Sequence, residues 1–211
     1  MTGLVRKASL LVVLGLLAAT AALAGVPDPT MCTLPTFVDL VSYDASGNVY
    51  QGAPVTVVVN DAAGNPIQGC DVTISFNDDV MIYDTQESPI VVSARTVTLT
   101  SGSDGVVVFH IGGAGKNSGA TGTYTGLAAA TITACGVTLC TANVTAYDEN
   151  GALGTPGVTG VDMSVWGIDY LSGLYIPRSD FNHNGALDGV DLSTWGIAYL
   201  AGYTYGNGTL Q

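Results

Sequence analysis

The chain has 211 residues, of which 17 are acidic and 5 are basic, so its formal net charge at pH 7 is −12. So few cationic side chains cannot neutralise a run of phosphates, which argues strongly against nucleic acid as a partner. The same charge balance argues against binding to an anionic membrane surface.

Residues 1–24 have the pattern of a secretory signal peptide. Two basic residues come first, a run rich in Leu, Val and Ala follows at 8–19, and an A-x-A cleavage signal ends the segment. A membrane anchor is the alternative, but the apolar run is short and no other segment is a transmembrane candidate. We therefore expect cleavage before Gly25, secretion to the extracellular space, and no membrane span in the mature chain.

Residues 25–35 are predicted to be an N-terminal linker, and the first of four cysteines lies within it. The cysteines are Cys32, Cys70, Cys135 and Cys140. Outside the cytosol an even number suggests two disulfides, whose three possible connectivities stay open at this point. A zinc site would need paired short spacings, and only Cys135 and Cys140 are close. Free buried thiols are the remaining alternative.

Residues 36–147 have the pattern of an antiparallel β-sandwich, because short segments rich in β-branched residues alternate with turn residues. These segments lie at 53–60, 70–77, 96–100, 106–111, 130–134 and 137–146. Helix signals are absent from this region. Several short strands at such spacing fit a sandwich of about a hundred residues.

Two stretches of this region resemble the bacterial Ig-like domains of the invasin and intimin type. They are V-T-V-V-V-N-D-A-A-G-N-P-I-Q-G-C-D-V-T-I-S-F at 55–76 and L-T-S-G-S-D-G-V-V-V-F-H-I at 99–111. The resemblance implies an Ig-like sandwich that serves as a spacer or adhesive module. It also implies that the domain carries no catalytic residues as a class.

The segment D-F-N-H-N-G-A-L-D-G-V-D at 180–191 places oxygen donors at the spacing of a twelve-residue calcium loop. The side-chain ligand positions are occupied by Asp180, Asn182, Asn184, Asp188 and Asp191, the carbonyl position by Ala186, and the turn position by Gly185. Three converging carboxylates would repel one another, and a hard divalent ion removes that penalty. The alternative is an Asn-Gly turn in an acidic, solvated loop. We expect calcium to be the ligand.

The sequence that closes this loop is duplicated. V-D-M-S-V-W-G-I-D-Y-L-S at 161–172 recurs as V-D-L-S-T-W-G-I-A-Y-L-A at 190–201, an offset of 29 residues. Each copy predicts a short helix that begins at the last loop ligand, Asp162 or Asp191, near the positive helix end.

Each predicted helix carries one aromatic stripe at helical spacing. The stripes are Met163, Trp166 and Tyr170 in the first copy and Leu192, Trp195 and Tyr199 in the second. We expect the two stripes to face each other. Gly167 and Gly196 each cost about 0.8–1.0 kcal/mol relative to Ala in a helix interior, which predicts close backbone approach between the helices.

With its duplicated loop and helix, the region 148–203 resembles a dockerin, an EF-hand-like calcium module of secreted bacterial proteins, followed by a tail at 204–211. The resemblance implies a module that folds around calcium and docks onto a cohesin-like or other extracellular protein partner. The second copy matches the family loop residue by residue. The first copy departs from it, which bears on whether cohesin binding carries over.

Two alignments of the first loop are possible. Counting back from Asp162 puts Gly151, Leu153, Thr155 and Thr159 at the side-chain ligand positions and Pro156 at the glycine position. Alternatively, the shared N-G-A-L at 150–153 and 184–187 implies an insertion, G-T-P-G-V, before Thr159. In that alignment Asp148, Asn150 and Asp162 gather around a second ion, and the choice stays open.

Catalytic residues are not predicted anywhere in the chain, and we expect a non-enzyme. Most acids of the β region fall in or beside turns, a nucleophile elbow is absent, and His183 is expected to face solvent. The leading hypothesis is a secreted attachment or cell-adhesion protein with a calcium-binding module. The alternative is a carbohydrate-binding accessory of polysaccharide catabolism, which exposed, coplanar Tyr83 and Tyr124 would favour.

Overall fold

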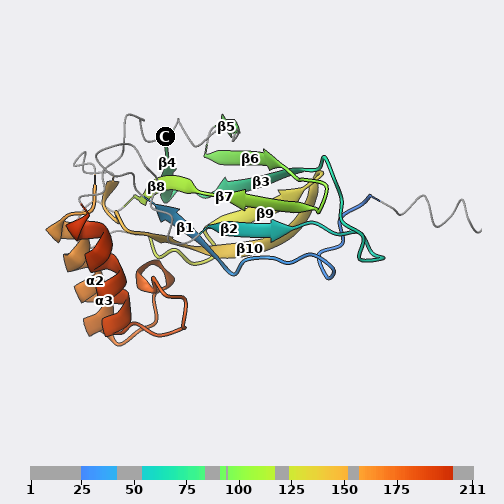
Figure 1. The fold of residues 1–211 in the computed structure, drawn as a ribbon. Helices are drawn as coiled ribbons and strands as arrows, with labels where there is room; N and C mark the ends of the chain where they lie inside the picture. Colours follow the sequence, from blue (N-terminus) through green and yellow to red (C-terminus); the bar gives the residue numbers. More distant parts are fainter. Residues whose placement is uncertain are drawn as a thin grey trace, which may run out of the picture.

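The computed structural model describes residues 25–41, 54–83, 91–93, 95–116, 124–151 and 157–201. The described chain is mainly β, with a large, mostly antiparallel sheet, a smaller sheet and two helices at one end (Figure 1). The strands are β1 (Phe37–Val41), β2 (Val55–Val58), β3 (Asp71–Phe76), β4 (Val80–Ile82), β5 (Val91–Ser93), β6 (Thr96–Thr100), β7 (Val106–Phe109), β8 (Ile111–Gly115), β9 (Ala130–Ala134) and β10 (Val137–Ala146). The helices are α2 (Gly160–Ser172), the 3₁₀ helix η2 (Pro177–Ser179) and α3 (Gly189–Leu200).

The larger sheet has eight strands in the order β4-β8-β1-β10-β9-β3-β6-β5, and β2 pairs with β7 separately. The β1 strand runs parallel to both β10 and β8, whereas the other pairs are antiparallel. The ten-residue β10 pairs first with β9, through Ala142, and then with β1, from Asn143. A register shift between Thr138 and Cys140 interrupts the first of these pairings. Strands commonly bend at such irregularities.

Alternation of apolar and polar residues explains why these segments form half-buried strands. In β3 the side chains of Val72, Ile74 and Phe76 are buried, while Thr73 on the other face hydrogen-bonds Thr98 of β6. One hydrophobic cluster joins residues of the large sheet to those of β2 and β7. Each such Val, Ile or Phe contributes about 1.5–3 kcal/mol when fully buried.

The strands expected at 96–100, 130–134 and 137–146 are confirmed with the same bounds. The segment expected at 106–111 forms parts of two strands, because strand structure is interrupted at His110 between β7 and β8. The sequence prediction missed β1, β4 and β5, of which the last two are three residues long. The β1 and β4 strands pair with strands distant in sequence, which a local pattern cannot show, whereas β5 pairs with the adjacent β6.

The two helices pack through their tryptophans and not through complete stripes. Trp166 and Trp195 are buried in a cluster with Tyr147 and Phe181, whose rings stack at 4.9 Å. By contrast, Met163, Tyr170 and Tyr199 are exposed, and each tyrosine stacks on the tryptophan one turn before it. The prediction that the two stripes face each other along their length was therefore wrong.

The two mid-helix glycines do not mark a close helix crossing. A Cβ atom added at Gly167 or Gly196 would meet nothing within 4 Å, so no backbone lies against either position. The prediction of close backbone approach was wrong. The two helices instead share one hydrophobic cluster that contains Trp166 and Trp195.

One of the two expected disulfides is formed, between Cys70 and Cys135. Pairing of Val72 with Ala134 brings the start of β3 beside the turn after β9, where the two Cα atoms lie 5.2 Å apart. Cys32 and Cys140 are free, so the second expected disulfide is absent. Cys32 lies beside Asn60, whereas Cys140 pairs across the ladder with Ile132 of β9.

The predicted N-terminal linker is hydrogen-bonded to the β region, with bridges from Pro27 to Asp61 and from Thr33 to Val58. The predicted signal peptide at 1–24 and the tail at 204–211 lie outside the described residues. Among the described helices, none combines the length and apolar character that crossing a membrane requires.

Candidate metal centre

The second loop lies between η2 and α3, and both elements position its ends. Asp180 follows η2 directly as its C-cap. At the other end Asp188 is the N-cap of α3, accepting a hydrogen bond from the Val190 N–H at 2.7 Å. Asp191 accepts from the Asp188 N–H at 2.8 Å, which completes a capping box. Helix initiation therefore places two of the predicted ligands.

The rest of the loop folds around the carboxylates of Asp180 and Asp191, both fully buried. Asp180 accepts hydrogen bonds from the N–H groups of Asn184 and Gly185 at 3.1 and 3.0 Å, and from the Tyr175 hydroxyl at 2.7 Å. Asp191 accepts from the Asn182 N–H at 3.1 Å. Gly185 has φ +82°, a conformation that favours glycine, as the predicted turn position requires.

The carboxylates of the second loop lie close enough together to repel one another. Burial raises the pKa of Asp191, and the charges of Asp180 and Asp188 raise it further against two backbone hydrogen bonds. Burial also raises the pKa of Tyr175, as does its hydrogen bond to Asp180. Among the described residues, neither Asp180 nor Asp191 forms an ion pair with a basic side chain.

These donors fit a hard divalent cation by chemical type, since carboxylates, amide oxygens and a carbonyl are the ligands that calcium takes. Within the described ranges, no group of three or more His, Cys, Asp or Glu side chains is arranged to hold a metal by itself. Calcium held here would therefore need the amide oxygens of Asn182 and Asn184 and the carbonyl of Ala186, in addition to the carboxylates.

In the first loop the structure brings Asp148, Asn150 and Asp162 together, all three fully or almost fully buried. The end of the Asn150 amide lies 3.1 Å from Asp148 Oδ1 and 3.3 Å from Asp162 Oδ1. With its nitrogen at this point, the amide donates a hydrogen bond to both carboxylates. With its oxygen there, three oxygens converge, and only a cation relieves their repulsion.

The described part of the first loop gathers the three residues that the alignment with an insertion names. Thr159 caps α2 and Asp162 completes its capping box, as Asp188 and Asp191 do 29 residues later. Gly157 donates its N–H to Asp148 Oδ2 at 3.0 Å, so the end of the loop closes back onto its start. Of the residues in the other alignment, Leu153, Thr155 and Pro156 lie outside the described residues.

His183, at the fourth position of the second loop, is an exposed residue as predicted, but its ring also contacts the β region. Its ring stacks on Phe37 of β1, with centroids 4.1 Å apart and planes 12° apart, and Nε2 lies 2.8 Å from Asp39 Oδ1. Burial lowers the pKa of His183, but the hydrogen bond and charge of Asp39 and the charges of Asp180 and Asp191 raise it overall. No sequence pattern links residues 39 and 183, so this contact could not be predicted.

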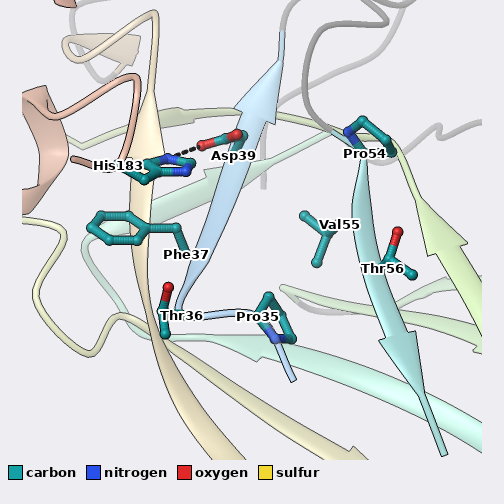
Figure 2. A pocket seen from close by; sticks show the side chains of 8 residues that line it. All are labelled: Pro35, Thr36, Phe37, Asp39, Pro54, Val55, Thr56 and His183. Carbon is teal, nitrogen blue, oxygen red and sulfur yellow. Dashed lines mark ion pairs between the residues drawn. The ribbon is translucent and has the colours of Figure 1, made fainter. Parts of the chain in front are cut away.

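Figure 2 shows this contact at one wall of a pocket of about 250 Å³ between β1 and β2. The opposite wall is formed by Pro54, Val55 and Thr56. The second loop therefore contacts the β region beside the pocket between β1 of the larger sheet and β2 of the smaller sheet.

A buried ionic network holds the segment before the second loop. Arg178 binds Asp169 of α2 and lies 3.3 Å from Glu149, while Ser179 donates to Asp169 at 2.6 Å. Burial raises the pKa of Glu149 well above its ordinary value, although Arg178 opposes this. Arg178 also donates to the Tyr124 carbonyl, which ties the network to the β region. Sequence inspection missed this role, though Arg178 is one of only five basic residues.

Comparison of the chain with protein-family models, with curated proteins and with solved structures found no match.

Proposed function

We propose that this chain is a secreted, non-enzymatic attachment protein, in which an Ig-like β-sandwich carries a dockerin-like calcium module. The observation that carries the proposal is the second loop, in which the carboxylates of Asp180 and Asp191 are fully buried and accept hydrogen bonds from backbone N–H groups of the same loop. Buried carboxylates without a basic partner destabilise a fold unless a cation offsets their charge.

Calcium supplies that positive charge when it is bound, and the chain supplies the ligands. Asp180, Asn182, Asn184, Asp188, Asp191 and the Ala186 carbonyl would hold the first ion; Asp148, Asn150 and Asp162 would contribute to a second. At about millimolar external calcium, a dissociation constant of about 10⁻⁴–10⁻³ M stabilises the fold by about 0.4–1.4 kcal/mol per site. A micromolar site would contribute about 4 kcal/mol.

The outer surface of the helices supports an attachment role. Apolar or aromatic residues are exposed at equivalent positions of both copies: Val161 and Val190, Ile168 and Ile197, Tyr170 and Tyr199, Leu171 and Leu200. The acids of the two helices, Asp162, Asp169 and Asp191, are all buried, so the exposed surface carries no charge. An apolar, uncharged surface of this kind is typical of protein interaction sites.

A carbohydrate-binding role lacks the exposed aromatic platform that would favour it. Tyr83 and Tyr124 are both fully buried, and Tyr124 donates its hydroxyl hydrogen bond to the Val144 carbonyl inside the core. Neither ring is available to stack on a sugar. We therefore do not propose carbohydrate binding for the described β region.

Calorimetric titration of the purified chain with calcium tests the metal site. Wild type is expected to bind at least one ion, and Asp191→Asn is expected to lose the tighter site because this carboxylate is central to the second loop. Asp71→Asn, an exposed acid on β3, is the matched control and should bind like wild type. Absence of binding to wild type would overturn the proposal.

Attachment is tested by capture from the host's secreted fraction, with calcium and with chelator. We expect a protein retained only with calcium. Changing Leu171 and Leu200, each 84 % exposed, to serine should abolish capture without lowering the melting temperature. Equal capture by this variant would place the interaction elsewhere.

A further inference from the structure

We infer that Phe37 and Asp39 on β1 are positioning residues for the second calcium loop and set its affinity through His183. The inference rests on the proposed function, since it concerns how tightly that loop holds its ion. It assigns to the β region a part in metal binding that the loop residues alone do not have.

His183 occupies a central place in the second loop. It lies between two predicted ligands, Asn182 and Asn184, and has φ +58°, a left-handed conformation that costs a non-glycine residue about 1–2 kcal/mol. Asn184 N–H also donates to Asn182 Oδ1 at 3.0 Å, which closes a tight turn across His183. The backbone conformation at His183 therefore sets the directions in which the side chains of Asn182 and Asn184 leave the backbone.

The anchor for this side chain lies outside the loop. The imidazole is held by the Phe37 ring on one face and by the Asp39 carboxylate at Nε2, as Figure 2 shows. Asp39 is itself buried and accepts a hydrogen bond from the Thr145 hydroxyl of β10. Because β1 pairs with β10 on one side and with β8 on the other, the anchor belongs to the interior of the large sheet.

A second attachment restrains the start of the same loop. Arg178 donates its backbone N–H to the Thr125 carbonyl at 3.1 Å, two residues before Asp180. The loop is thus tied to the β region on both sides of its first ligand. Ordering the loop before the ion arrives removes a conformational cost from binding, so affinity rises without any new metal contact.

The test measures calcium affinity in variants of β1 that touch no predicted ligand. Phe37→Leu is expected to weaken calcium binding about 5- to 10-fold, within the usual range of coupling between sites. Phe37→Tyr keeps the stacked ring and should restore the wild-type affinity. Thr36→Ala, on the same pocket wall, is the matched control.

The route through His183 is tested by a double-mutant cycle. Asparagine tolerates a left-handed conformation, so His183→Asn removes the anchor with little added strain. Phe37→Leu should then cause no further loss. Terbium bound in place of calcium gives a spectroscopic readout, because the Tyr175 hydroxyl lies 2.7 Å from Asp180 and its ring can sensitise luminescence.

The outcomes separate the two proposals. Wild type that binds neither calcium nor terbium would overturn the proposed function. Wild type and Phe37→Leu that bind calcium equally, both folded by circular dichroism, would overturn the positioning role and leave the proposed function standing. A loss with Phe37→Leu that persists in the His183→Asn background would also overturn it, since the ring would then act by another route.

Discussion

Arg178 holds Asp169 with two parallel hydrogen bonds, from Nε to Oδ2 and from Nη2 to Oδ1, each 2.7 Å long. Both side chains are buried, and Glu149 lies against the same guanidinium. Burial by itself lowers the pKa of Arg178, but the bonds to Asp169 and the charge of Glu149 raise it overall, so the side chain stays cationic. This pair joins the helical part to the segment that precedes the second loop.

Removal of the guanidinium should strongly destabilise the fold. Arg178→Ala leaves two buried acids without a counter-charge and is expected to cost about 3–5 kcal/mol, measured by urea unfolding. Arg95→Ala is the control, because its ion pair with Asp78 is exposed and should contribute about 0–1 kcal/mol. Equal costs for the two variants would show that the buried network is dispensable.

Gly126 should tolerate no side chain, because its backbone lies against the segment before the loop. Its φ is +73°, and an added Cβ would clash with the Val144 carbonyl and lie 2.9 Å from the Arg178 nitrogen. Gly69 has φ +74° with nothing within 4 Å, so Gly69→Ala isolates the conformational strain of about 1–2 kcal/mol. Gly126→Ala should lower the melting temperature well beyond Gly69→Ala. Similar melting temperatures would contradict the close approach.

Thiol titration of the unfolded, unreduced chain should find two free thiols, from Cys32 and Cys140. Absence of free thiols would show a second disulfide. The bond between Cys70 and Cys135 spans 65 residues, so replacing both by alanine should cost about 2–5 kcal/mol. Replacing Cys32 and Cys140 by serine is the matched control and should cost less.

Calcium stabilisation should grow as pH rises from about 4 to 7. Burial raises the pKa of Asp162 and of Asp191 above the ordinary value of 3.8. With chelator, their contribution to stability is therefore present below 3.8 and is lost as pH rises through the raised values. Calcium needs the deprotonated carboxylates, so its effect increases over the same interval.

The measurement is the difference in melting temperature between calcium and chelator at each pH, in which titrations common to both conditions cancel. We expect a small difference near pH 4 and a larger one near pH 7. Replacing Asp162 and Asp191 by asparagine should remove the trend. A difference that does not change with pH would contradict the assignment of these two carboxylates.

Local sequence patterns predicted the elements whose structure is decided by near neighbours. The alternating segment of β3 and the β-branched run of β10 formed strands, and the duplicated V-D-x-S motifs began both helices. The start of α3 depends on hydrogen bonds that span two or three residues, from the Val190 N–H to Asp188 and from the Asp188 N–H to Asp191. A motif of that length includes both partners of each hydrogen bond, so the helix start can be predicted from the local sequence.

The contacts of the loops with the β region could not be predicted from local sequence patterns. His183 and Asp39 are 144 residues apart, and their pairing depends on β1 lying between β10 and β8. The pairing of Cys70 with Cys135 likewise needed the β3 and β9 register, and the first loop needed its fold to show which residues meet.

By itself, the sequence determined the mainly β character, the helix starts to within two residues and the order of oxygen donors in the second loop, because each depends on periodicity or spacing over a few residues. Only the tertiary structure decided which cysteines pair, that the tryptophans rather than whole stripes join the helices, and that His183 is anchored on β1. These outcomes depend on strand order and side-chain volume, which bring together residues that are distant along the chain.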